Sequence, residues 1–205
     1  LFDIDLGGNS NLGKHTALVD LQGEIAPDTQ ASADAINASL QAAFENSESV
    51  GVILRVNSPG GSPVQSGIIH DEMLRLRAKY PEKSLHVVVE EICASGGYYV
   101  ASAAENIYVD KASLVGSIGV IMNGFGVTGL MEKLGIERRA ITAGKNKALL
   151  DPFSKQDPKQ KEFVQGMISE VHEQFMAWMS LKGLLNGLGW ADRSACEINR
   201  RNRMS

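Results

Sequence analysis

The sequence is poor in the features that define several large protein classes. Its 205 residues include two cysteines, Cys93 and Cys196, and two distant cysteines make neither a disulfide framework nor a metal site. The net charge is −4 and no block of basic residues precedes the last six positions, so the body of the chain lacks the electrostatic footprint of a nucleic-acid-binding protein. No run of about 18 apolar residues occurs, which predicts no membrane-spanning segment, and no signal peptide is recognisable.

What the sequence does contain is typical of a globular protein. Hydrophobic residues make up 43% and charged residues 21% of the chain, which is ordinary for a folded domain, and the length fits one sizeable domain. The 21 glycines cluster in short motifs rather than in a linker. The chain opens on Leu1 rather than on Met, so we expect a fragment or a mature segment.

Strand-type and helix-type patterns alternate along the chain. Strands are predicted at residues 16–21, 50–56, 85–89, 106–109 and 137–142. Helical spacing of apolar residues predicts helices at residues 35–46, with Ser32 as a cap, at 64–79, at 128–134 and from Pro158 onward; a short helix-compatible run covers 100–104. Two strands are each followed by a glycine-rich turn and a helix, which favours an α/β fold with a mostly parallel sheet. In such sheets, functional sites form beyond the carboxyl ends of the strands.

One serine stands where the third predicted strand gives way to a helix. Ser95 is followed by Gly96 and Gly97, and this position offers an exposed hydroxyl, free backbone N–H groups and the positive end of a helix dipole. These are the parts that a serine nucleophile and half of an oxyanion hole require. Cys93, two residues earlier, is interpreted as a small buried side chain rather than as the nucleophile.

The partner of this serine is less evident from the residues alone. None of the four histidines lies in a motif; they are His15, His70, His86 and His172. A Ser-His-Asp arrangement stays open, because triads are assembled in space. A lysine can replace the histidine where desolvation lowers the pKa of its amine, and the segment 142–150 supplies two candidates, Lys145 and Lys147, of which the second leads into an apolar run.

Four short motifs in a fixed order carry a family resemblance. With Lys147 lying 52 residues after Ser95, they resemble the ordered signature of the signal peptide peptidase A family, the S49 serine peptidases. The similarity extends from about His15 to Phe175. The motifs are Asn57-Ser58-Pro59-Gly60-Gly61, Ala94-Ser95-Gly96-Gly97-Tyr98-Tyr99, Gly116-Ser117-Ile118-Gly119-Val120 and Gly144-Lys145-Asn146-Lys147.

The resemblance implies a fold and a division of the chain. The expected fold is α/β, a Clp-protease/crotonase-like fold of repeated ββα units with a long C-terminal helix. Residues 1–14 are expected to form a flexible lead-in or tether, and residues 15–182 the S49 peptidase domain. Residues 183–205 depart from the family pattern and are expected to form an atypical or truncated tail.

The resemblance also implies a set of site residues. Ser95 matches the nucleophile and Lys147 the general base of a Ser-Lys dyad, while Ser117 matches a hydroxyl that orients the lysine amine. The N–H of Gly96 and one N–H from the Gly60-Gly61 turn would form the oxyanion hole, with the choice between these two glycines left open. Lys145 is not the expected base, because the family places the base at the second lysine of this motif. The resemblance implies no metal or cofactor.

Substrate and location follow from the same resemblance. The family implies a serine endopeptidase that hydrolyses hydrophobic, extended peptides such as cleaved signal peptides at the membrane. The chain resembles the short, single-repeat form, which implies a homo-oligomer. Membrane attachment is expected through an anchor outside these 205 residues, with the catalytic domain on the extracytoplasmic (periplasmic) side of the bacterial inner membrane and no nucleic-acid partner.

Three other functions are compatible with parts of this sequence pattern. A crotonase-like acyl-CoA enzyme would use the same fold, but it would need an active-site carboxylate and a CoA-binding surface rather than a serine in Ala-Ser-Gly-Gly. A catalytically inactive S49-like membrane assembly partner would keep the fold and lose the chemistry; the unusual C-terminus favours it, and the intact Ser95, Ser117 and Lys147 argue against it. A sibling peptidase that cuts stomatin-type membrane proteins shares the dyad.

Overall fold

The computed structural model describes residues 13–144 and 146–181. The chain divides into two compact units, one made of residues 1–118 and 177–205 and the other of residues 119–176. The first unit holds the sheet, and the second holds the connecting segment after the sheet and most of the long helix. The expected lead-in, residues 1–14, lies mostly outside the described residues, and the expected tail, residues 183–205, lies wholly outside them.

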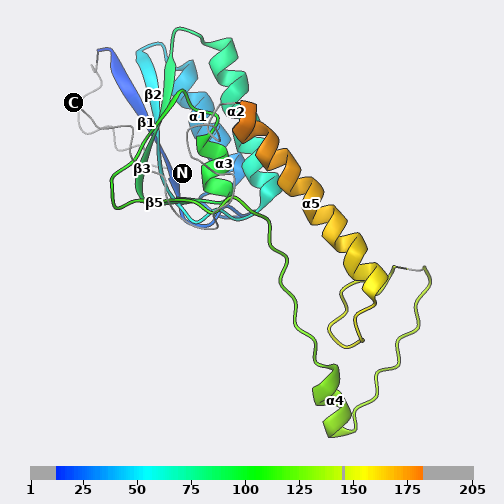
Figure 1. Ribbon diagram of the computed structural model, residues 1–205. Helices are drawn as coiled ribbons and strands as arrows, with labels where there is room; N and C mark the ends of the chain where they lie inside the picture. The colour runs from blue at the N-terminus through cyan, green and yellow to red at the C-terminus, as the bar shows by residue number, and fades with distance from the viewer. Residues whose placement is uncertain (1–12, 145, 182–205) are drawn as a thin grey trace. The chain divides into compact units, whose positions relative to one another are not determined.

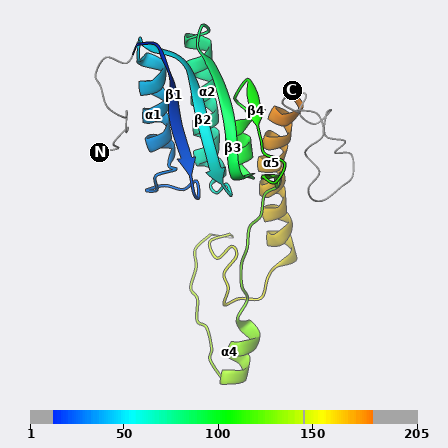
Figure 2. The ribbon, with the colours of Figure 1, turned by 90° about the vertical axis from the view of Figure 1, so that its left-hand side faces the viewer.

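A parallel sheet forms the centre of the first unit. Its described strands run in the order β1-β2-β3-β4, with β5 pairing to β3, and every pair is parallel. Figure 2 shows β1 to β4 side by side. The strands are β1 (His15–Gln22), β2 (Ser49–Ser58), β3 (Ser84–Ala94), β4 (Asn106–Tyr108) and β5 (Leu114–Gly116).

Three helices of this unit pack together on one face of the sheet (Figures 1 and 2). They are α1 (Ala33–Glu45), α2 (Pro63–Lys79) and α3 (Gly96–Ala101). Ser32 and Ser62 cap α1 and α2 by accepting the N–H of Ala35 and Gln65, which satisfies donors that a helix start leaves unpaired. The core between sheet and helices is made of fully buried apolar side chains, among them Leu21, Phe44, Leu54, Ile69, Met73 and Leu85.

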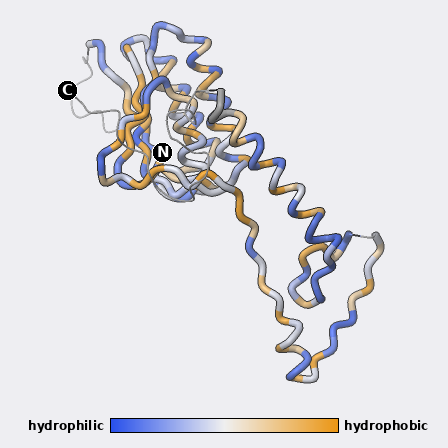
Figure 3. The backbone as a smooth tube through the Cα atoms, in the orientation of Figure 1, coloured by the Kyte–Doolittle hydropathy of each residue, from blue (hydrophilic) through white to orange (hydrophobic). Residues whose placement is uncertain are grey.

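The second unit contains α4 (Thr128–Leu134) and most of α5 (Pro158–Leu181), joined by long irregular segments. Figure 3 shows hydrophobic colour recurring along the segment between β5 and α4. Many of its large apolar side chains are nevertheless exposed, including Ile121, Phe125, Leu134, Ile136 and Ile141. The unit therefore buries little apolar surface by itself.

The structure confirms most of the predicted elements and corrects others. The strands predicted at 16–21, 50–56 and 85–89 are present and longer, the strand at 106–109 is one residue shorter, and the helix at 128–134 has the predicted bounds. The strand predicted at 137–142 is wrong: these residues are irregular and exposed, and no described strand lies beside them to complete a ladder. The helix expected at 100–104 begins earlier, at Gly96.

The fold class is confirmed at the coarse level, an α/β protein with a parallel sheet followed by a long helix. In residues 13–144 and 146–181, no helix combines the length and apolar character needed to cross a membrane.

Candidate functional site

Ser95 occupies a sharp turn between β3 and α3. Its backbone has φ 50° and ψ −121°, a conformation that a non-glycine residue adopts only when its surroundings enforce it. The enforcing contacts are backbone hydrogen bonds: the Ser95 N–H donates to the carbonyl of Gly116 at 2.7 Å, and the Ser95 carbonyl accepts the N–H of Tyr99 at 3.0 Å. The half-buried side chain makes no capping hydrogen bond to the helix, so its hydroxyl is not used for the structure of the turn.

The two glycine-rich turns pack directly against each other. A Cβ atom placed on Gly60 would lie 2.6 Å from the nitrogen of Gly96 and 2.9 Å from the Cβ of Ser95. A Cβ on Gly96 would overlap the hydroxyl of Ser66 and lie 3.4 Å from the nitrogen of Gly61. The absence of side chains at these positions therefore lets the Gly60-Gly61 turn reach the backbone around Ser95.

Backbone donors remain available beside Ser95. The N–H of Gly60 donates to the hydroxyl of Ser58 at 3.1 Å. Among the described residues, the N–H groups of Gly61 and Gly96 donate no hydrogen bond. Two such donors beside the turn of a serine nucleophile are the parts from which an oxyanion hole is built, which stabilises the negative charge that develops on a carbonyl oxygen during acyl transfer.

Ser117 lies beside Ser95 through the register of the sheet. Strand β5 pairs with β3 so that Gly116 is opposite Ala94, and Ser95 and Ser117 directly follow the last residues of these two strands. Ser117 is exposed and has φ 55°. The structure thus brings together five of the predicted site residues in the first unit, namely Ser95, Gly96, Ser117, Gly60 and Gly61.

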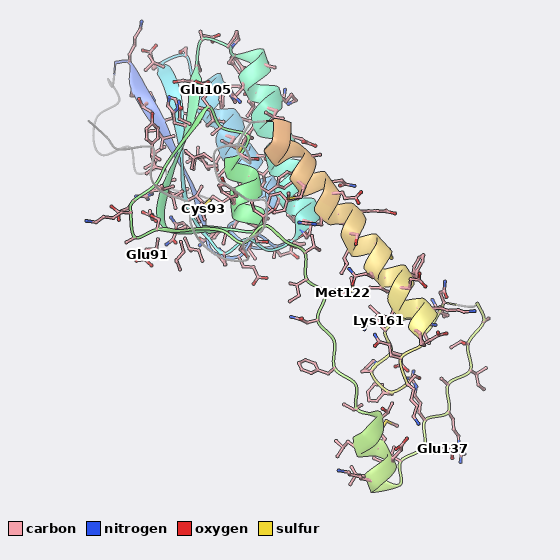
Figure 4. The ribbon with its side chains drawn as sticks, viewed as in Figure 1. Glu91, Cys93, Glu105, Met122, Glu137 and Lys161 are labelled. Atoms are coloured by element: carbon pink, nitrogen blue, oxygen red, sulfur yellow. The ribbon has the colours of Figure 1, made fainter. Side chains whose placement is uncertain are left out.

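Cys93 is a core residue. It is fully buried near the end of β3, where Figure 4 labels it, and burial raises the pKa of its thiol to about 12. The thiolate is the nucleophilic form of cysteine, so Cys93 is unreactive near neutral pH. The same environment raises the pKa of Tyr98 to about 12, mainly through burial and then through Cys93.

The histidines of the described segments serve packing and surface contacts. The ring of His70 is buried and stacks on Tyr99 at 4.7 Å between centroids, and its Nδ1 lies 3.2 Å from a carboxylate oxygen of Asp71. His86 contacts Tyr108 edge-to-face at 5.9 Å. Ser95 has no hydrogen bond to a histidine within residues 13–144 and 146–181.

Lys147 belongs to the second unit. It is exposed in the turn that follows Gly144, to whose carbonyl its N–H donates at 3.2 Å; Lys145 lies outside the described residues. Ser95 belongs to the first unit and Lys147 to the second, and their pairing is a prediction.

The second unit has a hollow of its own. It encloses about 620 Å³ and is lined by the first turns of α5 and by residues on both sides of α4, with Met122 and Lys161, labelled in Figure 4, among its walls. Its lining mixes apolar side chains with amides, lysines and Asp151. The described residues contain no cluster of side chains that could hold a metal ion.

The sequence did not predict a role for Ser58 and Ser66, the two buried serines that contact the glycine-rich turns. Ser58 and Ser66 are buried and contact the glycines of the site. A serine inside Asn-Ser-Pro-Gly-Gly, at the end of a buried strand, was the available indication for Ser58, but its partners lie in other segments.

Comparisons with known proteins place these residues in a wider group. The family model described as peptidase family S49 matches residues 77–184, which include Ser95, Ser117 and Lys147. The chain is 37% identical over 168 residues to the Na(+)/H(+) antiporter NhaA of Brucella melitensis, covering 78% of this chain and 23% of that protein.

Two further relatives carry peptidase names. The Methanocaldococcus jannaschii protein MJ0651, named as a protease, is 42% identical over 138 residues, or 67% of this chain and 43% of its own length. An Enterococcus faecium protein named as signal peptide peptidase SppA is 32% identical over 126 residues, or 62% of this chain and 36% of its own length. The chain therefore spans less than half of the length of each of these relatives.

Proposed function

The chain belongs to peptidase family S49, and on that premise we propose that it is a serine endopeptidase in which Ser95 is the nucleophile and Lys147 the general base. The observation that carries the proposal is the turn at Ser95. Its backbone is strained, its hydroxyl is not used by the fold, and two N–H groups without hydrogen-bond partners in the described residues, those of Gly61 and Gly96, lie next to it.

The proposed reaction is acyl transfer followed by hydrolysis. Lys147 takes the proton of the Ser95 hydroxyl, and the oxygen attacks the peptide carbonyl. The oxyanion accepts hydrogen bonds from the N–H of Gly96 and from an N–H of the Gly60-Gly61 turn, and removing one such donor typically costs about 3 kcal/mol of transition-state stabilisation. The Lys147 ammonium then protonates the leaving amine, and the lysine activates the water that releases the acyl group.

Ser117 is proposed to orient the lysine amine. Ser117 follows Gly116, the register partner of Ala94, so it lies next to Ser95 at the carboxyl ends of β3 and β5. There it could hydrogen-bond only to a base that approaches this end of the sheet. The alternative for Ser117 is a turn serine that contacts nearby backbone groups.

The proposed substrates are hydrophobic, extended peptides, with cleaved signal peptides as the leading class. This rests on the family resemblance and on the relative named as signal peptide peptidase. An extended peptide would bind by strand addition, with its main chain hydrogen-bonded and its side chains in alternate pockets. The corresponding fold proposal is a Clp-protease/crotonase-like arrangement of ββα units. The match to the antiporter covers under a quarter of that protein, so ion transport is not proposed.

A homo-oligomer is proposed as the active form, attached to the bacterial inner membrane by an anchor outside these residues and facing the extracytoplasmic side. Lys147 is exposed, and the unit that carries it exposes many large apolar side chains. A lysine base needs desolvation to hold a neutral amine, and exposed apolar side chains need a partner surface. Contact with further copies of the chain would supply both.

The dyad is tested by single substitutions assayed on a hydrophobic peptide ester. Ser95→Ala and Lys147→Ala are each expected to lower kcat/KM by at least about a thousandfold, since members of such a catalytic unit act together. Lys145→Ala, which removes the neighbouring lysine, is the matched control and should stay within about threefold of the unmodified chain.

Retained turnover in Lys147→Ala, or an equal loss in Lys145→Ala, would contradict the assignment of the base. A folded chain without any Ser95-dependent turnover would point instead to an inactive assembly partner.

A further inference from the structure

Ser58 ties two turns together through one buried hydroxyl. It is the last residue of β2 and is fully buried. Its Oγ donates to the carbonyl of Gly23 at 2.6 Å and accepts the N–H of Gly60 at 3.1 Å. The single hydroxyl proton and one oxygen lone pair are thus both in use, so the side chain has one defined orientation.

Ser58 also lies against the turn of the nucleophile. Its register partner in β3 is Cys93, two residues before Ser95. A Cβ placed on Gly97, in the first turn of α3, would lie 3.1 Å from the Ser58 carbonyl oxygen and 3.3 Å from the Ser58 Cβ. A change at Ser58 therefore reaches both the Gly60-Gly61 turn and the backbone behind Ser95.

The hydroxyl of Ser58 separates the roles of the two glycines. Gly60 is buried and its N–H is held by Ser58, whereas Gly61 is exposed and its N–H has no acceptor among the described residues. Backbone hydrogen bonds fix the turn from the other side: the Ile25 N–H donates to the Gly60 carbonyl at 2.8 Å, and the Ser62 N–H donates to the Ile25 carbonyl at 2.7 Å. The position of the Gly61 N–H is set by partners on both flanks.

From this geometry we infer that Ser58 is a positioning residue of the oxyanion site. By occupying the N–H of Gly60 and anchoring the turn to Gly23, it leaves the Gly61 N–H as the donor that acts together with the Gly96 N–H. The inference rests on the proposed peptidase function, and it decides between Gly60 and Gly61. Ser58 touches neither substrate nor the reacting atoms; it acts through the turn.

The test removes the Ser58 hydroxyl and compares binding of a transition-state analogue with binding of the intact peptide. Ser58→Ala is expected to lower kcat/KM for a hydrophobic peptide ester by about tenfold to a hundredfold, less than the loss of a donor itself. The inhibition constant of a peptide boronic acid, which forms a tetrahedral adduct with a serine, should rise by a similar factor. In a Ser95→Ala background, the dissociation constant of the uncleaved peptide should stay within about twofold when Ser58→Ala is added, because only transition-state binding uses the oxyanion donors.

Ser49→Ala is the matched control. Ser49 is the first residue of the same strand, is also buried, and donates its hydroxyl to the carbonyl of Gly51 at 3.1 Å. The Ser49→Ala substitution removes the same kind of hydrogen bond at the opposite end of β2. Both kcat/KM and the affinity for the boronic acid should therefore stay within about twofold of those of the unmodified chain.

A folded Ser58→Ala chain with unchanged kcat/KM, or one that loses affinity for intact peptide and boronic acid alike, would overturn the inference. If Ser58→Ala does not fold, Ser58→Cys, which keeps a side chain of similar size, is measured by the same criteria and should show a smaller loss of the same kind. Failure of the proposed function itself is read separately, from equal activity of the unmodified chain and its Ser95→Ala variant.

Discussion

Gly60 packs so closely against the turn that contains Gly96 that a side chain on Gly60 would overlap backbone atoms. Gly60 has φ 94°, in the left-handed region that favours glycine, and its hypothetical Cβ would meet the backbone of Ala94 and Gly96 at 2.7 and 2.6 Å. Backbone atoms cannot rotate away as the end of a side chain can. The contact between the two turns therefore depends on the backbone of Gly60 as much as the chemistry depends on Ser95.

A substitution at Gly60 should accordingly affect both stability and turnover. We expect Gly60→Ala to lower the free energy of unfolding by about 2 kcal/mol or more, from the strained φ and from the overlap, and to reduce kcat/KM at least tenfold. Urea unfolding followed by circular dichroism, together with the ester assay, measures the two effects.

Gly67→Ala provides the control for the same change in side chain. Gly67 lies inside α2, where a Cβ would meet only the Tyr99 ring, at 3.9 Å. Alanine is favoured over glycine in a helix by about 1 kcal/mol, so this variant should be as stable as the unmodified chain or more so. Equal stability of the two variants would show that the contact between the turns is not tight.

Cys93 gives a prediction about pH. Burial raises the pKa of its thiol from 9.0 to about 12, so the folded state holds the neutral thiol where the unfolded state would ionise. This contribution to stability is complete below pH 9 and is lost as the pH rises from about 9 towards 12. At pH 8, iodoacetamide should leave Cys93 unmodified in the folded chain and modify it in urea, as read by peptide mass spectrometry; rapid modification without urea would contradict its burial.

At the scale of elements, Lys83 closes the end of a helix that lacks its own basic residue. Helix α1 has no basic side chain in its last turn. Lys83, from the turn before β3, is almost fully buried, and its Nζ donates to the carbonyls of Phe44 and Asn46, each at 2.7 Å. Carbonyls at a helix end have no partner within the helix, so this side chain joins the end of α1 to the sheet.

Removing this amine should cost stability. Lys83→Met keeps much of the apolar stem and removes the donor of the Phe44 carbonyl, while the Asn46 carbonyl keeps the N–H of Ser49 at 3.1 Å. We expect a loss of about 1–3 kcal/mol in the free energy of unfolding. Lys79→Met is the control, because Lys79 is half exposed and its partner Glu45 is 3.7 Å away; such surface pairs contribute about 0–1 kcal/mol. Urea unfolding of both variants checks the difference, and equal losses would contradict the capping role of Lys83.

How far the sequence could predict these elements depends on where their partners lie. The apolar run of β2 and the serine cap of α1 are local, and both predictions are confirmed. The strand predicted at 137–142 failed because a strand also needs a neighbouring strand, which the residues of the segment itself do not reveal. The roles of Ser58 and Lys83 depend on carbonyls 35 and 39 residues away in the chain, so no spacing rule could find them.

The candidate site likewise combines features that the local sequence predicts with features that depend on distant segments. The turn at Ser95 and its two glycines could be predicted, because strand, glycines and helix follow one another in the sequence. The packing of Gly60 against Gly96 could not, since it depends on how β2 and β3 align. The family resemblance supplied Lys147 where physical reasoning left the base open, and the pairing of that lysine with Ser95 remains a prediction.

At the scale of the whole molecule, the second unit exposes many of its large apolar side chains. Ile121, Phe125 and Ile141 are 79%, 87% and 101% exposed, and the side chains of this unit that are buried in the described structure are few, Val164 and Phe175 among the apolar ones. Large apolar side chains that are exposed in such numbers often mark an interaction site. Together with the exposed Lys147, they favour a partner that covers this unit.

The final prediction concerns that partner. If copies of the chain cover the second unit, Phe125→Glu should place a carboxylate in an apolar interface, where an unpaired charge is costly, and should shift the molar mass measured by light scattering towards that of one chain. Hydrolysis of the peptide ester should fall in parallel, by at least tenfold, because the site would lose the desolvation of its base.

Val50→Glu is the matched control. Val50 is 47% exposed at the start of β2, at the end of the strand away from Ser95, so both the molar mass and the activity should remain those of the unmodified chain. An unmodified chain that is monomeric and fully active at assay concentration would contradict the oligomer, since Lys147 would then have to act without any covering copy.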